Sequence, residues 1–110
     1  MPIFVTQGRY SRDAIKGMLA KPEDRLEVAA KLAQAAGGKL LAYYVTFGDY
    51  DWLVVSEMPD ATHAAAFVLT AAASGGVSDV RTMLAMTTAD AKAAFVTAGE
   101  MGGAYRPPGG

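Results

Sequence analysis

Tyrosine, aspartate and arginine side chains occur where two apolar segments end or begin, and they could form one binding or catalytic site. Arg9 and Tyr10 follow the first apolar segment, and Tyr50 and Asp51 open a later one. An aspartate can act as a base or anchor a ligand, a tyrosine can donate hydrogen bonds, and an arginine can hold an anion. These types favour a site that binds a small polar or anionic group.

Further aromatic residues flank this cluster. Tyr43 and Tyr44 precede it and Trp52 follows it, and with Tyr50 they could line a small apolar pocket. Two functions fit such a pocket. One is a ligand-binding or assembly module that takes a small apolar ligand. The other is a cofactor-independent enzyme of the monooxygenase or isomerase type with its pocket near Tyr50 and Asp51.

A structural alternative stays open for the same residues. Asp51 could hydrogen-bond Thr46 or a backbone group near a turn, while Tyr50 packs against Phe47. On that interpretation the residues fix strand pairing and perform no reaction. The sequence does not exclude an enzyme, but it favours the binding module.

Composition excludes several classes of site. The chain has no cysteine, so disulfides, thiolate catalysis and cysteine metal sites are ruled out, and one histidine, His63, is too few for a typical zinc site. We expect no metal and no cofactor. The net charge is −1 and no lysine or arginine run occurs, so we expect no nucleic-acid partner. No signal peptide or membrane span is visible, which predicts a cytoplasmic protein without a membrane partner.

The elements that must position these residues follow from hydrophobic spacing and from glycine and proline. Ser11, Asp60 and Thr87 or Thr88 are expected to cap helices, and Pro22 interrupts the first helical region and opens its second segment. The pattern predicts strands over 2–8, 39–47, 50–57 and 77–86, and helices within 11–36, within 60–74 and from about 88 to 99.

This order is β-α-β-β-α-β followed by a helix. It is the ferredoxin-like arrangement of the α+β class, a four-stranded antiparallel sheet with helices on one face. We expect one domain over residues 1–100 and a flexible tail over residues 101–110, where glycine and proline dominate.

The central hairpin predicts an assembly. Gly48-Asp49 is typical of a two-residue type II′ turn, which would place Phe47 opposite Tyr50 and Val45 opposite Trp52. Both faces of the hairpin are then apolar, although helices can cover only one of them. We therefore expect a homodimer through the open sheet face, with a higher oligomer also open. The alternative is that the terminal helix or the tail folds over this face.

The chain also resembles the GYD domain family. The resemblance lies in Phe47-Gly48-Asp49-Tyr50-Asp51, in Pro59-Asp60 before an alanine-rich helix, in Gly37-Gly38-Lys39-Leu40 and in Val80-Arg81-Thr82. It runs from residue 2 to about residue 95. The resemblance implies a small bacterial protein of the dimeric α/β-barrel type, in a family of uncharacterised function. It supplies no catalytic or binding residue for transfer.

Overall fold

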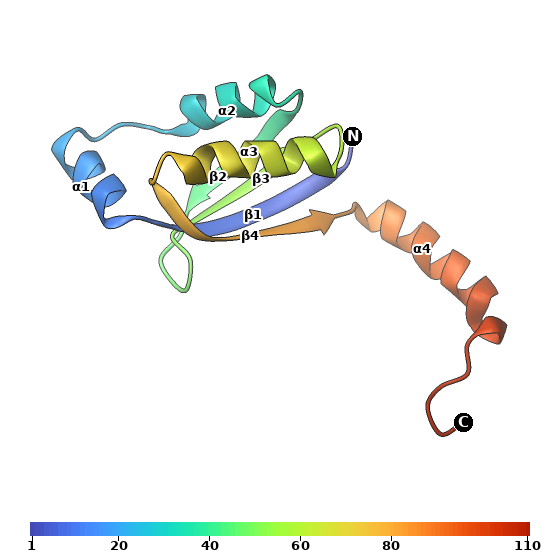
Figure 1. The fold of residues 1–110 in the computed structure, drawn as a ribbon. Coiled ribbons are helices and arrows are strands. Elements are labelled where there is room, and N and C mark those ends of the chain that lie inside the picture. Colours follow the sequence, from blue (N-terminus) through green and yellow to red (C-terminus); the bar gives the residue numbers. More distant parts are fainter.

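A computed structural model describes residues 1–110 as a four-stranded sheet with helices on one face and a last helix that stands apart (Figure 1). The elements in chain order are β1 (Ile3–Tyr10), α1 (Arg12–Ala20), α2 (Leu26–Ala35), β2 (Lys39–Val45), β3 (Trp52–Glu57), α3 (Ala61–Ala73), β4 (Val77–Ala85), α4 (Thr88–Met101) and a short 3-10 helix (Gly102–Ala104).

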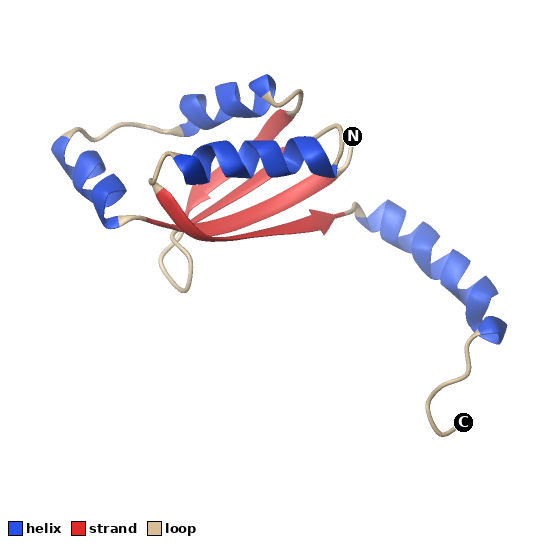
Figure 2. Cartoon of the chain, in the orientation of Figure 1, coloured by secondary structure: helices blue, strands red, loops and turns tan.

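The sheet has the strand order β2-β3-β1-β4, and every neighbouring pair is antiparallel. The helices α2 and α3 lie across one face of it (Figure 2). This arrangement confirms the α+β class and the four-stranded antiparallel sheet, and it is compatible with the ferredoxin-like fold. The central position of β1 places Tyr10 beside strands that come from the far part of the chain.

The helix starts follow the capping residues. The Ser11 hydroxyl accepts the backbone N–H of Ala14, and Asp60 and Thr87 cap α3 and α4 in the same way. Each cap satisfies a backbone donor that the first helical turn would leave unpaired. Gly37 ends the α2 region with φ +82°, a conformation that glycine adopts without a steric penalty.

The segment after Pro22 differs from the prediction. Pro22 does not open the second helix, which begins only at Leu26. The carboxylate of Asp24 accepts the backbone N–H of Leu26 at 2.9 Å, so the side chain of Asp24 organises the start of α2 from outside it. Residues 21–25 form an extended connection between α1 and α2.

The hairpin keeps the predicted register but not the predicted turn. Val45 pairs with Trp52, as expected, and Tyr43 pairs with Val54. The strands end at Val45 and resume at Trp52, so Gly48-Asp49 belongs to a longer loop over residues 46–51. Gly48 has no positive φ, which a type II′ turn would require. The pairing of Thr46 with Asp51 closes this loop instead, through the Thr46 N–H and the Asp51 carbonyl at 2.8 Å.

The core lies between the sheet and its helices. Alternate residues of β1 and β3 point into it, as a strand period of two requires. The opposite face has no helix over it, and there Tyr44 is 64% exposed and Met83 is 51% exposed. The buried apolar residues are Phe4, Ala33, Trp52, Val54, Met58, Ala64 and Phe67.

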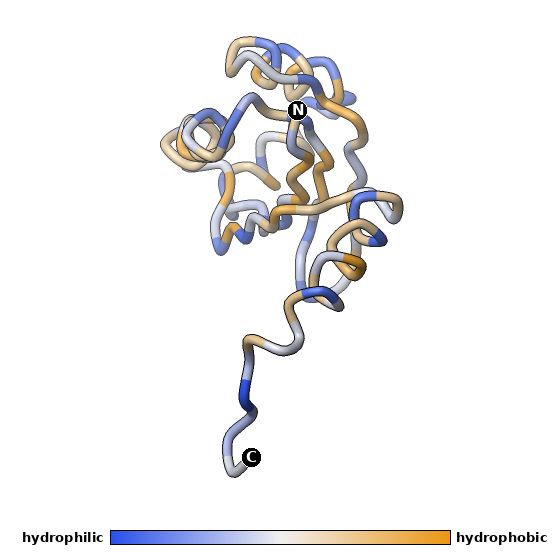
Figure 3. Tube along the Cα trace, turned by 90° about the vertical axis from the view of Figure 1, so that its right-hand side faces the viewer, coloured by the Kyte–Doolittle hydropathy of each residue, from blue (hydrophilic) through white to orange (hydrophobic).

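The helix α4 leaves the sheet instead of covering it (Figure 1). It has no buried residue, and Phe95 is 77% exposed. The radius of gyration is 17.8 Å, whereas a globular chain of this length has about 13 Å. The alternative in which the terminal helix folds over the open face is therefore wrong. Figure 3 shows apolar segments along α4 although it stands in solvent.

Candidate functional site

A cavity of about 620 Å³ lies between the helices and the covered face of the sheet. Pockets that bind small molecules have volumes of roughly 300–1,000 Å³ and mostly apolar walls. The walls here are also mostly apolar, and all four strands contribute to them. The helical side of the cavity comes from α1, α2, α3 and the 21–25 connection; it includes Met18, Val28, Ala29, Leu32, Phe67 and Val68.

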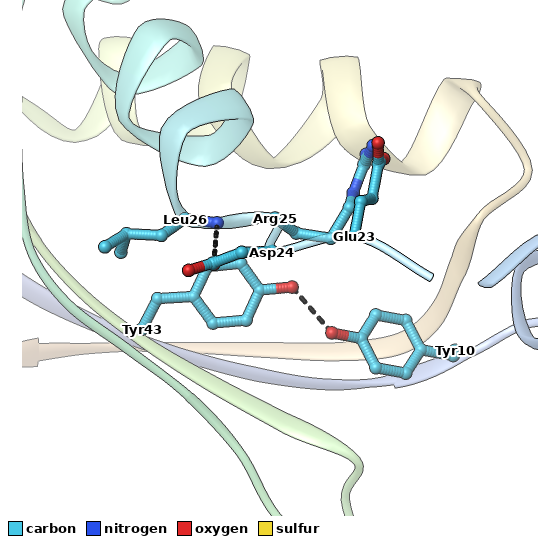
Figure 4. Close-up of polar contacts among 6 residues, drawn as sticks. All are labelled: Tyr10, Glu23, Asp24, Arg25, Leu26 and Tyr43. Carbon is cyan, nitrogen blue, oxygen red and sulfur yellow. Dashed lines mark hydrogen bonds and ion pairs between the residues drawn. The ribbon is translucent and has the colours of Figure 1, made fainter. Parts of the chain in front are cut away.

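Three of the polar residues that line the cavity come from neighbouring strands. Tyr10 ends β1, Tyr43 lies near the end of β2, and Trp52 begins β3. Because these strands are antiparallel neighbours, the three residues lie toward the same end of the sheet. The hydroxyls of Tyr10 and Tyr43 are 2.6 Å apart and share a hydrogen bond (Figure 4).

Trp52 contributes a hydrogen-bond donor that has no partner. Its ring packs on Gly8, where a Cβ atom would lie only 2.4 Å from the ring carbon Cζ2, so only glycine fits beneath the indole. The residue is 7% exposed, and its Nε1 is buried without an acceptor. The indole N–H can only donate. A buried unpaired donor costs about 1–3 kcal/mol.

Burial raises the pKa of Tyr10 well above its usual value, and the hydrogen bond to Tyr43 raises it further. The Tyr10 phenol therefore stays protonated at neutral pH. Two neutral hydroxyls in one hydrogen bond use one O–H proton between them, which leaves the other O–H free to donate to a third group.

The 21–25 connection forms the exposed border of the cavity. Lys21, Glu23 and Arg25 all line it, and all three are exposed. Arg25 is paired with Glu23, with 2.7 Å between a guanidinium nitrogen and a carboxylate oxygen. Figure 4 shows this connection above the tyrosine pair. Because Asp24 also lies in this connection, the border carries two cations and two anions.

The residues predicted from sequence separate in the structure. Tyr10, Tyr43 and Trp52 line the cavity together. Tyr44 points to the open face, because its neighbour Tyr43 points to the covered one. Arg9, next to Tyr10, is likewise exposed away from the cavity. The remaining predicted residues outside the cavity are Tyr50 and Asp51, and Tyr50 is half-buried in the 46–51 loop.

Asp51 ties the loop to β1. Its carboxylate accepts the backbone N–H of Tyr10 at 2.9 Å, and its own N–H donates to the Gly8 carbonyl at 2.8 Å. The hydroxyl of Thr46 donates to the Tyr50 carbonyl at 2.7 Å in the same loop. Asp51 does not line the cavity, so the geometry agrees with its structural interpretation and does not place a base beside a pocket.

Sequence reasoning missed the helical part of the site. The spacing of Phe67 and Val68 predicts a buried helix stripe, without any link to a pocket. Leu32 follows the same helical spacing on α2, so amphipathic spacing was the available signal. No such signal marks Arg25, because its position depends on where the 21–25 connection crosses the cavity.

The only histidine lies outside this site. His63 is exposed on α3, and its Nδ1 is 2.6 Å from the carboxylate of Asp60. The pKa of Asp60 is lowered because its carboxylate accepts the backbone N–H of His63 and bonds the His63 ring. No three His, Cys, Asp or Glu side chains come together as a metal site would require. None of the helices combines the length and the hydropathy needed to cross a membrane.

Solved structures of other proteins have a fold similar to that of this chain. The crystal structure of TTHA0845 from Thermus thermophilus matches with a TM-score of 0.51 and 17% identity, over 79% of this chain and 95% of that chain. An AsnC family transcriptional regulator from Agrobacterium tumefaciens matches with a TM-score of 0.53 and 21% identity, over 78% of this chain and 50% of the regulator. At such identities the likeness shows the fold alone.

Sequence comparison is more informative. A curated protein of Thermus thermophilus, described as a glutamine synthetase and cystathionine beta-lyase binding protein, is 31% identical over 90 residues, which are 82% of this chain and 94% of that protein. The family model of the GYD domain matches residues 4–95. The chain therefore belongs to the GYD domain family.

Proposed function

We propose that this protein is a small-molecule-binding module that works as a homodimer, with its ligand in the cavity between the helices and the sheet. One observation carries the proposal: a mostly apolar cavity of about 620 Å³ is lined by Tyr10 and Tyr43, whose hydrogen-bonded hydroxyls retain one O–H that can donate to a ligand. The apolar walls supply affinity, and the few polar groups supply orientation.

Trp52 is the only tryptophan in the chain, so its fluorescence reports directly on the cavity. Native mass spectrometry of freshly purified protein should show a retained small molecule, and removing it should shift the Trp52 emission. Ala29→Phe should fill the cavity and abolish retention, since Ala29 lines it. Ala35→Phe, on the exposed side of the same helix, is the matched control. Equal retention by both variants would contradict the proposal.

The homodimer is supported by the uncovered face of the sheet. Tyr44 and Met83 are mostly exposed there, and Leu53 and Val55 lie between them on the central strand β3. A large aromatic side chain buries ~150–250 Å² when covered, worth ~25 cal/mol per Å². A second copy packed sheet to sheet would bury this face with two-fold symmetry.

Light scattering tests the assembly. The native chain should have the mass of a dimer. Leu53→Arg should give a monomer because it places a charge in the centre of the open face, against which the second copy would pack. Gln34→Arg, on the exposed side of α2, should remain dimeric. A native chain that is monomeric at high concentration would overturn the dimer, and a mass above two copies would indicate a higher oligomer.

A second candidate is a module that binds metabolic enzymes. The curated relative is described as binding glutamine synthetase and cystathionine beta-lyase, and α4 here presents an exposed apolar side with Phe95, Val96 and Met101. Gel filtration of this protein mixed with each of these two enzymes from its own source would show a complex. Phe95→Ser should abolish it, whereas Ala29→Phe should not; no complex with either enzyme would exclude this function.

A further inference from the structure

We infer that two copies of this chain pack their open faces together about a twofold axis that runs along the strands, so that Tyr44 of each copy lies on Arg81 of the other. This inference rests on the homodimer proposed above, and it adds the arrangement of the two copies and the contact that selects it. The pairing of the strands carries the inference, because it fixes which side chains share each row of the open face.

The open face consists of three rows of four residues, with one residue from each strand in the order β2, β3, β1 and β4. Side chains alternate between the two faces along a strand, so all three rows lie opposite the face on which Thr6 and Val54 are buried. The first row is Tyr44, Leu53, Gln7 and Arg81, the second is Ala42, Val55, Val5 and Met83, and the third is Lys39, Glu57, Ile3 and Ala85.

The two edges of this face carry complementary residues. In the first row Tyr44 on β2 is 64% exposed, and Arg81 on β4 is exposed and forms no ion pair within the chain. An arginine over an aromatic ring forms a cation–π contact. In the second row the small Ala42 lies on β2 and the large Met83 on β4, and large side chains pack best opposite small ones. Each edge therefore complements the opposite edge and not itself.

Symmetry gives two ways to align the strands of two facing sheets. A twofold axis along the strands lays each row on itself in reverse order, so β2 of one copy faces β4 of the other. Tyr44 then faces Arg81 of the second copy. In the next row Ala42 faces Met83 of the second copy. This arrangement pairs both edges with their complements, and each contact occurs twice.

An axis across the strands matches the edges less well. It lays the second row on itself in the same order, so Met83 meets Met83 at one edge and alanine meets alanine at the other. Tyr44 would then face Lys39 of the second copy, although Lys39 already lies opposite Glu57 in its own sheet. Arg81 would have no aromatic partner.

The loop over residues 46–51 extends the same match. It projects from the sheet on the side away from α2 and α3 (Figure 1), and Phe47 within it is 99% exposed. The axis along the strands brings this loop toward the end of β1 of the second copy, where Arg9 is exposed. A second aromatic ring thus comes near a second cation.

Cross-linking tests the arrangement, because the native chain has no cysteine. Facing sheets lie ~10 Å apart, too far for a disulfide, so a short bismaleimide is the reagent. Ala42→Cys/Met83→Cys should give a covalent dimer on a denaturing gel, and neither single variant should. Within one copy the two positions are three strands apart, ~14 Å, which is beyond the reach of the reagent.

Substitutions test the contact itself. Tyr44→Leu and Arg81→Gln should each raise the dissociation constant of the dimer roughly tenfold. Tyr44→Phe keeps the ring and should change it little, and Arg12→Gln, exposed on α1, is the matched control. Tyr44→Leu/Arg81→Gln should weaken the dimer about as much as either single variant, because both changes remove the same contact. Sedimentation measures the dissociation constants, and circular dichroism confirms that each variant folds. Fully additive losses would refute the contact.

The outcomes separate this inference from the proposed homodimer. If the native chain is monomeric at high concentration, the homodimer fails and the inference fails with it. If the native chain is a dimer but a single cysteine variant cross-links, or the double variant does not, the homodimer stands and this arrangement is wrong.

Discussion

The covered and open faces of the sheet are made by alternate residues of the same strands, yet they are filled differently. On the covered face Trp52 and Val54 are buried and polar groups gather at one end of a cavity. On the open face Tyr44 and Met83 remain mostly exposed.

This difference separates a covered face that is packed within one copy of the chain from an open face that is not. The covered face has its own core. The open face and α4 expose apolar side chains of the kind that monomers normally keep scattered or buried. Substitutions on the two sides should therefore differ in size and in their dependence on protein concentration.

The largest difference is expected between two phenylalanines. Phe67→Ala removes a ring that is 9% exposed in the core, and it should lower the free energy of unfolding by about 3 kcal/mol or more. Phe95→Ala, at a ring that is 77% exposed on α4, should cost less than about 0.5 kcal/mol in a monomer. Urea unfolding at two protein concentrations measures both. A loss for Phe95→Ala that grows with concentration would show that α4 packs on a second copy.

Two glycines give the next comparison. Gly8→Ala would push a methyl group into the Trp52 ring and should cost about 1–3 kcal/mol through overpacking. A Cβ atom added at Gly48 would have no neighbour within 4 Å, and Gly48 has no positive φ. Gly48→Ala should therefore change the free energy of unfolding little. Trp52 emission should shift only for Gly8→Ala. Equal effects would mean that the ring can move away at no cost.

The loop contact to β1 should matter less. Asp51→Ala removes the acceptor for the Tyr10 backbone N–H and should cost about 1 kcal/mol. Asp49→Ala, at an exposed position in the same loop, is the control. Thermal unfolding measures the stability. Hydrogen exchange at Tyr10 should become faster only in Asp51→Ala, and an unchanged rate would contradict the structural role of Asp51.

The smallest effect concerns the cap of α3. The folded pKa of Asp60 lies below its unfolded value, so its charge stabilises the fold fully above that unfolded value and loses this effect as pH falls through the folded pKa. Asp60→Asn keeps a capping oxygen without the charge. Its melting temperature should fall slightly below that of the native chain at pH 7, and the two should converge well below pH ~4. A difference in melting temperature that stays constant across that pH range would rule out the charge of Asp60 as its source.

The sheet was predictable because its signals are local. Runs of β-branched and aromatic residues mark β1 and β3, and the caps at Ser11 and Asp60 set the helix starts. The turn type was not predictable, since Gly48 permits a type II′ turn without requiring one. Hydrogen bonds from Asp51 to β1 give the loop its form, and these depend on contacts far along the chain.

The site was predicted only in part, for a similar reason. Strand order brings Tyr10, Tyr43 and Trp52 together, and that order follows from the succession of elements. Whether a strand residue lines the cavity also depends on the face of the sheet to which its side chain points, and this excludes Tyr44. The contribution of Arg25 depends on the path of an irregular connection, for which no periodic signal exists.

The central position of β1 also constrains how the chain is made. β1 is synthesised first, but one of its partners is β4, and Ile3 pairs with Ala85 near the other end of the domain. During translation the β2–β3 hairpin can form early, whereas β1 must wait for most of the chain before its second edge is paired.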